Sequence, residues 1–216
     1  MSAARSAILD RVRRAERAGK IPFVDRDAHV ARAFRPAAGA APLKGCTTDV
    51  QRFLAELAAL GVATFIEDSA DAVRARVTEV VGGRAVLMWS ASCLPYNVAY
   101  VLPQAVTESS PRGLQAAADI GVTGCDAAIA ETGSLVFMSG EGKPRTASLL
   151  PPVHLAIVQR GDVRATMGEF FRERAADIAA SACCTFVTGP SRTADIELTL
   201  TLGVHGPGQV IVVLGP

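Results

Sequence analysis

The sequence predicts an α/β protein, with a mostly parallel sheet flanked by helices and an N-terminal helical arm. Two observations support this class. From residue 47 onward, amphipathic segments of helical length alternate with short apolar runs of strand length, which is typical of the crossover units of parallel sheets. Half of the 216 residues are hydrophobic, so the chain can bury a sizeable core and is neither disordered nor fibrous.

The N-terminal part is expected to be an appendage to the α/β domain. Ile8 and Val12 lie four residues apart among Arg and Glu, which predicts an amphipathic helix over residues 2–18. Residues 20–46 contain three prolines and the stretch AAGAAP, a composition typical of a linker. The expected domains are a helical arm with its linker at residues 1–40 and an α/β domain at residues 41–216.

The first half of the domain is expected to form helix, strand, helix and strand in turn. Thr47 or Thr48 can cap the first helix and Ser69 can cap the second, because their hydroxyls can accept hydrogen bonds from the free backbone N–H groups at a helix start. The two strands are the apolar runs VATFI and AVLMW. The four elements are expected at residues 48–60, 62–66, 69–81 and 85–89.

The second half consists of shorter apolar runs broken by turn residues. Glu131-Thr132-Gly133 is expected to form a tight turn whose glycine supplies a positive φ, so residues 126–138 should form two strands folded on each other. Residues 139–152 hold too much Pro and Gly for a helix or a central strand. The remaining elements are expected as strands at 127–130, 134–138, 153–158, 184–189 and 209–214 and as a long helix at 163–180.

Charge and hydropathy exclude two classes of partner. The chain has 22 basic and 21 acidic residues, so it lacks the basic surplus with which proteins bind nucleic acid. Its longest clean apolar run, residues 210–214, is far below the roughly 20 residues that span a bilayer. The N-terminal residues do not resemble a secretory signal. We therefore expect a cytoplasmic protein with no membrane span.

This chain is expected to bind no metal and no cofactor of its own. The five cysteines include no C-x-x-C pair, and the three histidines have no zinc-binding spacing. Neither a dinucleotide fingerprint nor a phosphate loop of the nucleotide-binding type occurs in the sequence. Lys143 and Arg145 lie in a Gly-rich segment that is either a solvated loop or a docking place for an anion.

Polar and ionisable residues gather in three segments at predicted strand ends. The first is the turn at residues 131–133. In the second, Ser191 or Thr193 can cap a short helix, and the third is Gly203-Val204-His205-Gly206. Because parallel strands deliver their trailing loops to the same edge of a sheet, we expect these segments to line one pocket. The candidate catalytic residues are Glu131 and His205, and the candidate ligand-binding residues are Thr132, Gly133, Ser191, Thr193 and Asp195.

Each candidate also has a purely structural interpretation. His205 can serve as a general base or ligand contact, or it can make only structural hydrogen bonds. Asp195 can orient a polar ligand, or it can stabilise the start of a helix. The Glu131 carboxylate can contact a ligand, or it can accept backbone N–H groups and fix the hairpin. Asp126 is expected to cap a turn.

Three ordered motifs resemble a known family. The runs GxTGxDxAIAETGSL, SLLPPVHxAIV and GPSRTADIExxLxLGVHGP lie within residues 119–214 and are similar to the signature of the LUD (lactate utilisation) family. The B type of this family adds a cysteine-rich, ferredoxin-like segment that this chain lacks, so the chain resembles the C type. The resemblance implies a fold like that of sugar-phosphate isomerases, glucosamine-phosphate deaminases and CoA transferases.

The same resemblance implies a function. It points to an accessory or subunit protein of a system that oxidises L-lactate to pyruvate, acting with iron–sulfur partner proteins and binding a small carboxylate or a related ligand. The clusters are expected in the partners. In CoA transferases of the similar fold, a glutamate beside a glycine attacks the acyl-CoA, and the turn at Glu131 resembles that arrangement. The alternative is therefore an enzyme that binds acyl-CoA or sugar phosphates and uses Glu131.

Overall fold

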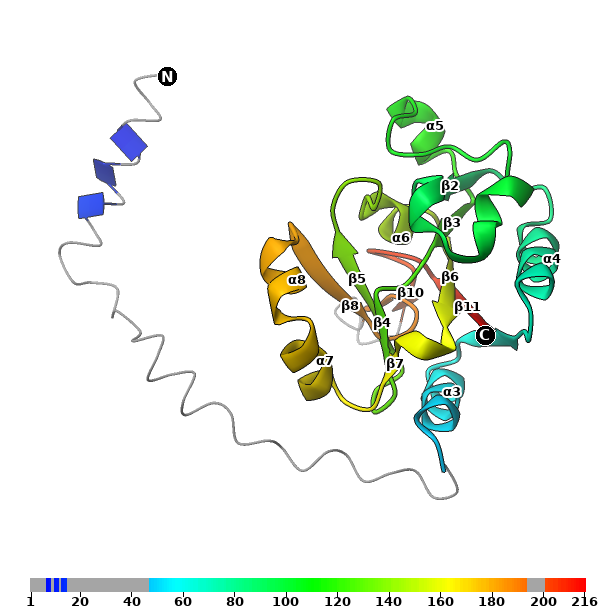
Figure 1. Cartoon of the computed structure of the whole chain (residues 1–216). Coiled ribbons are helices and arrows are strands. Elements are labelled where there is room, and N and C mark those ends of the chain that lie inside the picture. The colour runs from blue at the N-terminus through cyan, green and yellow to red at the C-terminus, as the bar shows by residue number, and fades with distance from the viewer. Residues whose placement is uncertain (1–6, 9, 12, 15–46, 194–200) are drawn as a thin grey trace. The chain divides into compact units, whose positions relative to one another are not determined.

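A computed structural model describes residues 7, 8, 10, 11, 13, 14, 47–193 and 201–216 (Figure 1). The chain divides into two compact units, residues 1–38 and residues 39–216. In the first unit the described residues are helical, and the rest of the predicted arm helix and linker lies outside the described residues. The domain boundary at residue 40 stays a prediction.

The second unit is built on a five-stranded, entirely parallel sheet, as the alternation of helices and strands predicts. Its strands are β1 (Ala63–Ile66), β2 (Val86–Met88), β3 (Ile120–Thr123), β6 (Val153–Gln159) and β11 (Gln209–Gly215). They lie in the order β1-β11-β6-β3-β2. The last strand therefore lies inside the sheet, paired along its whole length with β6. Burial on both faces explains why β6 and β11 are continuous apolar runs, whereas β1, at one edge of the sheet, has no buried residue.

A second sheet of four strands holds the predicted hairpin. Its strands are β4 (Ala127–Ile129), β5 (Ser134–Ser139), β7 (Val163–Arg164) and β8 (Cys183–Val187), in the order β7-β4-β5-β8. β4 and β5 are antiparallel, and the turn between them ends at Gly133 with φ +66°, as expected for a glycine there. Leu135 and Phe137 of β5 belong to the same buried core as the parallel sheet.

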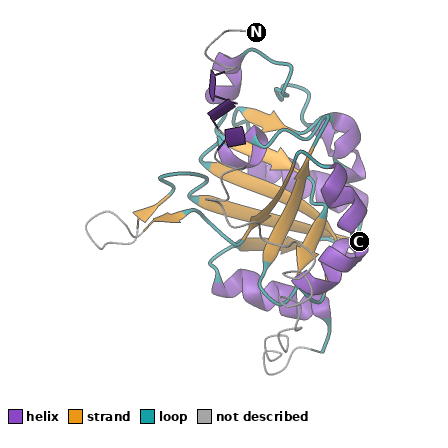
Figure 2. Ribbon diagram, turned by 90° about the vertical axis from the view of Figure 1, so that its left-hand side faces the viewer, coloured by secondary structure: helices purple, strands orange, loops and turns teal. Residues whose placement is uncertain are grey.

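Helices and short segments surround these sheets (Figures 1 and 2). The α-helices of this unit are α3 (Asp49–Ala59), α4 (Ala70–Val81), α5 (Arg112–Ala116), α6 (Thr146–Leu149), α7 (Met167–Glu173) and α8 (Ala175–Ala180). The 3-10 helices are η1 (Ala91–Cys93), η2 (Pro95–Val101) and η3 (Arg160–Asp162). Thr48 and Ser69 cap α3 and α4 through their side chains, as their hydroxyls predict. A small hairpin, β9 (Arg192–Thr193) with β10 (Thr201–Leu202), extends from the larger sheets.

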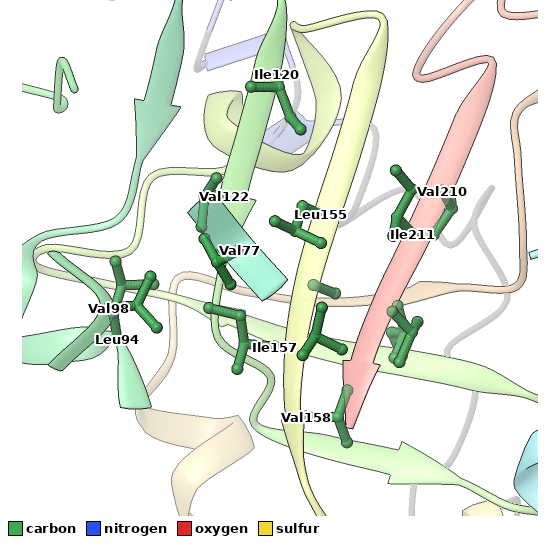
Figure 3. Packing of buried hydrophobic residues seen from close by; sticks show 14 of the residues in the cluster. Val77, Leu94, Val98, Ile120, Val122, Leu155, Ile157, Val158, Val210 and Ile211 are labelled. Atoms are coloured by element: carbon green, nitrogen blue, oxygen red, sulfur yellow. The ribbon is translucent and has the colours of Figure 1, made fainter. Parts of the chain in front are cut away.

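The two faces of the parallel sheet are covered by different elements. On one face, Val77 of α4 and Val98 of η2 lie beside the side chains of β3 and β6 (Figure 3). Successive residues of a strand point to opposite faces, and Gly121 of β3 faces the other way, toward α6. A Cβ atom at Gly121 would lie 1.8 Å from the carbonyl oxygen of Ala147. The α6 backbone can therefore pack directly on the sheet only because this residue is glycine.

Two expectations about the elements were wrong, and a third falls on residues that the structure does not describe. The predicted helix at 163–180 begins later and is broken, because Val163 and Arg164 pair with β4 and Arg174 leaves helical geometry with φ −112° and ψ 18°. The segment 139–152, predicted to be a loop, contains the short helix α6. Thr193 pairs with Thr201 as part of β9, and the short helix that Ser191 or Thr193 was expected to cap lies outside the described residues.

Deletion of residues 1–40 is expected to leave a folded domain. Among the described residues, all the buried hydrophobic ones lie between Phe53 and Leu214, and Ile8 is 62% exposed. Removal of the arm and linker therefore takes away no core contact that the structure describes. Thermal unfolding followed by circular dichroism should give one cooperative transition within a few degrees of the full chain. A truncated protein that is insoluble, or that loses its near-ultraviolet signal, would contradict the expected boundary.

Candidate functional site

A polar pocket lies at the carboxyl edge of the parallel sheet, where open α/β sheets bind their ligands. Its volume is about 410 Å³. Trp89 directly follows β2, Gly124 directly follows β3, and Gln159 ends β6. The complete lining is Trp89, Ser92, Cys93, Leu94, Pro95, Gly124, Cys125, Asp126, Lys143, Gln159, Asp162 and Arg174.

Two connections between the sheets form much of the pocket wall. Residues 124–126 join β3 of the parallel sheet to β4 of the second sheet, and residues 160–162 join β6 to β7. Gly124 is held close to the opposite wall, because a Cβ atom there would lie 3.1 Å from the carbonyl oxygen of Cys93. The wall therefore depends on a glycine at this position.

A buried ion pair forms the charged centre of the polar pocket. Nζ of Lys143 donates to Oδ1 of Asp126 at 2.5 Å, and the Asp126 side chain is only 7% exposed. The backbone N–H of Met138 donates to the other carboxylate oxygen at 2.7 Å. Nζ of Lys143 also lies 5.1 Å from the centre of the Trp89 ring, within the range of a cation–π contact. The lysine is thus held in place by a carboxylate and an aromatic face.

Arg174 and Asp162 place a second cation and a second carboxyl in the same pocket. Nη1 of Arg174 donates to the backbone oxygen of Asp126 at 3.4 Å, and Nε2 of Gln159 donates to Asp162 at 3.3 Å. Burial raises the pKa of Asp162, although the Gln159 hydrogen bond and the guanidinium groups of Arg164 and Arg174 oppose that shift. The Asp162 carboxyl is therefore easier to protonate than a solvent-exposed aspartate.

The cysteines of the pocket are not arranged as nucleophiles. Burial raises the pKa of the Cys125 thiol to about 12, and its sulfur donates to the backbone oxygen of Ala127 at 2.7 Å. A thiol with this pKa remains protonated at neutral pH and reacts slowly. Cys93 contacts the backbone oxygen of Glu141 at 3.9 Å. Of the two pocket cysteines, Cys125 is therefore unsuited to act as a nucleophile at neutral pH.

The chain adopts an unfavourable backbone conformation beside the pocket wall. Tyr96 and Asn97 have φ values of 57° and 53°, in the left-handed region that non-glycine residues rarely adopt. Tertiary contacts hold them there: Nη1 of Arg74 donates to the Tyr96 backbone oxygen at 2.8 Å, and the Tyr96 hydroxyl donates to the Pro216 backbone oxygen at 2.6 Å. Such strain often accompanies functional sites, which supports the assignment of this pocket.

Glu131, the predicted catalytic carboxylate, has a structural contact. The backbone N–H of Met167 donates to its Oε1 at 2.8 Å, at the start of α7, which Thr166 caps. The neighbouring Thr132 belongs to a row of hydroxyls, with Thr132 and Thr188 each 2.7 Å from Ser134 Oγ. None of these residues lines the polar pocket.

The other two predicted segments contact each other. The Gly203 N–H donates to the Ser191 backbone oxygen at 3.0 Å, and the Ser191 N–H donates to that of Pro207 at 2.9 Å. His205 is exposed, and Asp195 lies outside the described residues. The Gly208 N–H donates to the Pro152 backbone oxygen, and Pro152 directly precedes β6. The loop therefore lies at the amino edge of the sheet, where it leads into β11. The loop follows β10 and not a strand of the parallel sheet, so the reason for expecting it at the carboxyl edge of that sheet was wrong.

The first and second predicted segments both reach the end of α3. A Cβ atom at Gly133 would lie 3.1 Å from the Leu60 side chain, and one at Gly189 would lie 3.2 Å from it. Arg192 donates to the Leu60 backbone oxygen at 2.7 Å. Contacts therefore link the three segments in series, while a common pocket for Glu131, Ser191 and His205 stays a prediction.

The charged residues of the polar pocket were not among the candidates from the sequence. Asp126 was expected to cap a turn, and β3, the strand that ends just before Gly124, was not among the predicted strands. The place of Asp126 just beyond a strand of the parallel sheet is a signal for a site, and it was missed for that reason. Lys143 was expected in a loop that is solvated or docks an anion. Arg174 lies in the middle of what the sequence predicts as one helix, and nothing in the sequence signals the break that turns it toward the pocket.

Substitution of Glu131 tests whether it supports α7. Glu131→Ala is expected to lower the free energy of unfolding by about 1 kcal/mol, because the N–H of Met167 loses an acceptor near a helix start. Glu131→Gln should remain close to the parent, since its amide oxygen can still accept. Urea unfolding of both variants measures this, with exposed Glu141→Ala as the control. Equal stability of Glu131→Ala and the parent would contradict the structural role.

Comparison with known proteins defines the class of this chain. A crystal structure of a DUF162 family protein from Deinococcus radiodurans superposes with a TM-score of 0.64, at 22% identity, over 78% of this chain and 96% of that protein. The two share the α/β fold predicted from the sequence. The family model of the LUD domain matches residues 104–214, more than half of the chain. The chain belongs to the LUD domain family.

Curated relatives are named lactate utilization protein C. The chain is 43% identical over 94 residues to the protein of that name from Halalkalibacterium halodurans, a match that covers 42% of this chain and 41% of the relative. It is 35% identical over 101 residues to the one from Bacillus subtilis, covering 45% and 42%. The chain thus matches about two fifths of the length of these relatives.

The described residues offer neither a membrane-spanning helix nor a cluster of metal ligands. No helix among them is long and apolar enough to cross a membrane. No group of three or more His, Cys, Asp or Glu residues in the described part of the chain could hold a metal ion. The expectation that the chain carries no cofactor of its own stays a prediction.

Proposed function

We propose that this protein is a component of a lactate-utilisation system and binds a short carboxylate, lactate or a related 2-hydroxy acid, in the polar pocket. The observation that supports the ligand class most directly is that two cations, Lys143 and Arg174, and two carboxyls, Asp126 and Asp162, line one cavity. The names of the curated relatives support the lactate role.

The two kinds of charge suit the two ends of a 2-hydroxy acid. The ligand carboxylate pairs with Lys143 and Arg174, since ionised donors make the stronger hydrogen bonds. The ligand hydroxyl donates to Asp162. Because Asp126 already holds Lys143 at 2.5 Å, the lysine is oriented before the ligand arrives. The Lys143 ammonium group then donates hydrogen bonds to both the Asp126 carboxylate and the ligand carboxylate.

The oxidation of lactate to pyruvate removes two electrons and two protons, and the electrons need an acceptor. We assign that part to iron–sulfur partner proteins, and to this chain the binding and presentation of the acid. The alternative, an enzyme for acyl-CoA or sugar phosphates that uses Glu131 as nucleophile, requires that carboxylate to release the Met167 N–H that it now accepts at 2.8 Å. This contact favours the binding role.

Calorimetric titration tests the ligand. L-lactate, pyruvate and propionate should each bind saturably, with propionate weakest because it lacks the 2-oxygen. Trp89 is the only tryptophan of the chain and lines the pocket, so its fluorescence gives a second readout. Lys143→Met should weaken lactate binding roughly tenfold or more, the value of a hydrogen bond to a charged group.

Two further variants keep the test interpretable. Asp162→Ala should weaken lactate binding relative to propionate binding, because only lactate offers a hydroxyl that loses its acceptor. Arg112→Met, on exposed α5 and outside the pocket lining, is the control for loss of a positive charge. The proposal fails if none of the three acids binds, or if Arg112→Met weakens lactate binding as much as Lys143→Met.

A further inference from the structure

A second cavity lies beside the polar pocket and differs from it in chemistry. This apolar groove has a volume of about 610 Å³, and its lining includes Pro144, Leu149, Leu150 and Ala182 together with Lys143 and Arg145. Leu149 is 36% exposed and Leu150 48% exposed. Two neighbouring leucines that remain partly exposed in a hollow of this size leave apolar surface without a partner among the described residues.

The groove has a cationic end and an aliphatic end. Lys143 and Arg145 flank Pro144 just before α6, whereas Leu149 and Leu150 lie at the opposite end of that helix. About one turn of helix separates the two ends. Arg145 forms no ion pair with any described residue. The groove therefore offers a free positive charge next to a strip of exposed leucine.

We propose that the apolar groove binds an amphiphilic monocarboxylate, with the carboxylate at Lys143 and Arg145 and an unbranched aliphatic chain along Leu149 and Leu150. Charge complementarity selects the anionic head, and the leucines select the aliphatic chain. Lys143 also lines the polar pocket, so an acid in the groove and one in the pocket share a cation. The inference does not depend on the lactate role.

A homologous series of acids tests this with the full chain. Complete burial of one methylene group contributes about 0.8 kcal/mol, or roughly fourfold in affinity. From butyrate through hexanoate to octanoate, the affinity measured by calorimetry should rise about tenfold or more, even with partial burial. 1-Hexanol, which has a chain but no charge, should bind more weakly than hexanoate.

Variants locate the site without altering the polar pocket. The double variant Leu149→Ser/Leu150→Ser should weaken octanoate binding about fivefold or more and leave butyrate unchanged. Leu114→Ser, at a leucine that is 55% exposed on α5, is the matched control. Arg145→Gln should weaken all three acids and leave 1-hexanol unchanged.

The possible outcomes separate this inference from the proposed function. Equal affinity for butyrate and octanoate, or equal effects of the double variant and Leu114→Ser, would overturn the inference even if lactate binds. If octanoate binds as expected and lactate does not, only the proposed function fails. A concentration-dependent dimer in sedimentation that Leu149→Ser/Leu150→Ser abolishes would show that a second copy occupies the groove, and would also overturn the inference.

Discussion

Replacement of Gly121 by alanine is expected to lower the free energy of unfolding by about 3 kcal/mol or more, at the upper end of what overpacking a core costs. The added methyl carbon would lie 1.8 Å from the carbonyl oxygen of Ala147 and 3.3 Å from the Pro151 side chain. The near contact is backbone, which cannot turn aside as a flexible side chain can. Either α6 leaves the sheet, or β3 bends away from its neighbours β2 and β6.

The same substitution elsewhere provides the control. Gly113 lies in α5, and a Cβ atom there would meet nothing within 4 Å. Gly113→Ala should therefore stabilise the protein slightly, by about 0.5–1 kcal/mol, because alanine loses less conformational entropy in a helix. Urea unfolding of both variants measures the difference. Near-equal stabilities for the two would contradict the close packing of α6 on the sheet.

The second large effect concerns acid and His154. This side chain is fully buried in β6, its Nε2 lies 2.9 Å from the Thr123 hydroxyl, and its ring centre lies 5.3 Å from that of Phe137. Nδ1 has no hydrogen-bond partner among the described residues. Burial lowers the pKa of His154 to about 4, from about 6.5 for an unfolded chain. A proton therefore binds the unfolded chain more readily than the folded one.

Acid should therefore destabilise the folded chain through His154. Above about pH 6.5 the histidine is neutral in both states and its contribution to stability is complete; as the pH falls toward 4, the unfolded chain takes up a proton that the folded chain does not. On the order of 3 kcal/mol of unfolding free energy should be lost over this window. Urea unfolding at several pH values between 4 and 7.5 measures the slope.

Two histidine variants test whether His154 causes the loss of stability at low pH. His154→Leu should be less stable than the parent at pH 7, because the Thr123 hydroxyl loses its partner, but it should lose about 3 kcal/mol less on acidification. His205→Leu removes an exposed histidine and should keep the parent's slope. If His154→Leu has the same pH dependence as the parent, carboxyl groups elsewhere account for the acid sensitivity.

The sequence was sufficient for the fold where local signals and tertiary structure agree. Thr48 and Ser69 cap the helices that they were expected to cap, and Gly133 has the positive φ that its turn requires. The apolar runs of β6 and β11 predict parallel strands because both faces of each strand are buried. The prediction of a helix from residue 163 failed because tertiary pairing outweighs the local sequence pattern there: Val163 and Arg164 pair with β4.

The candidate site was harder to predict for a geometric reason. The candidates from the sequence lay in glycine-rich loops, and the loop at His205 was expected to follow a strand of the parallel sheet. It follows β10 of the small hairpin and precedes β11. The polar pocket brings together Asp126, Lys143 and Arg174 from three connections that are far apart in sequence. Their meeting depends on the order of the strands and on the break at Arg174, neither of which composition or spacing reveals.

The two connections that wall the polar pocket, residues 124–126 and residues 160–162, also hold the two sheets together. The polar pocket thus lies where the chain passes twice from one sheet to the other. A ligand that binds one relative orientation of the two sheets more tightly than another would favour that orientation, and by reciprocity any contact that favours the same orientation would raise the affinity for the ligand. A partner protein that binds only the second sheet could therefore change the ligand affinity of the pocket without contacting the pocket.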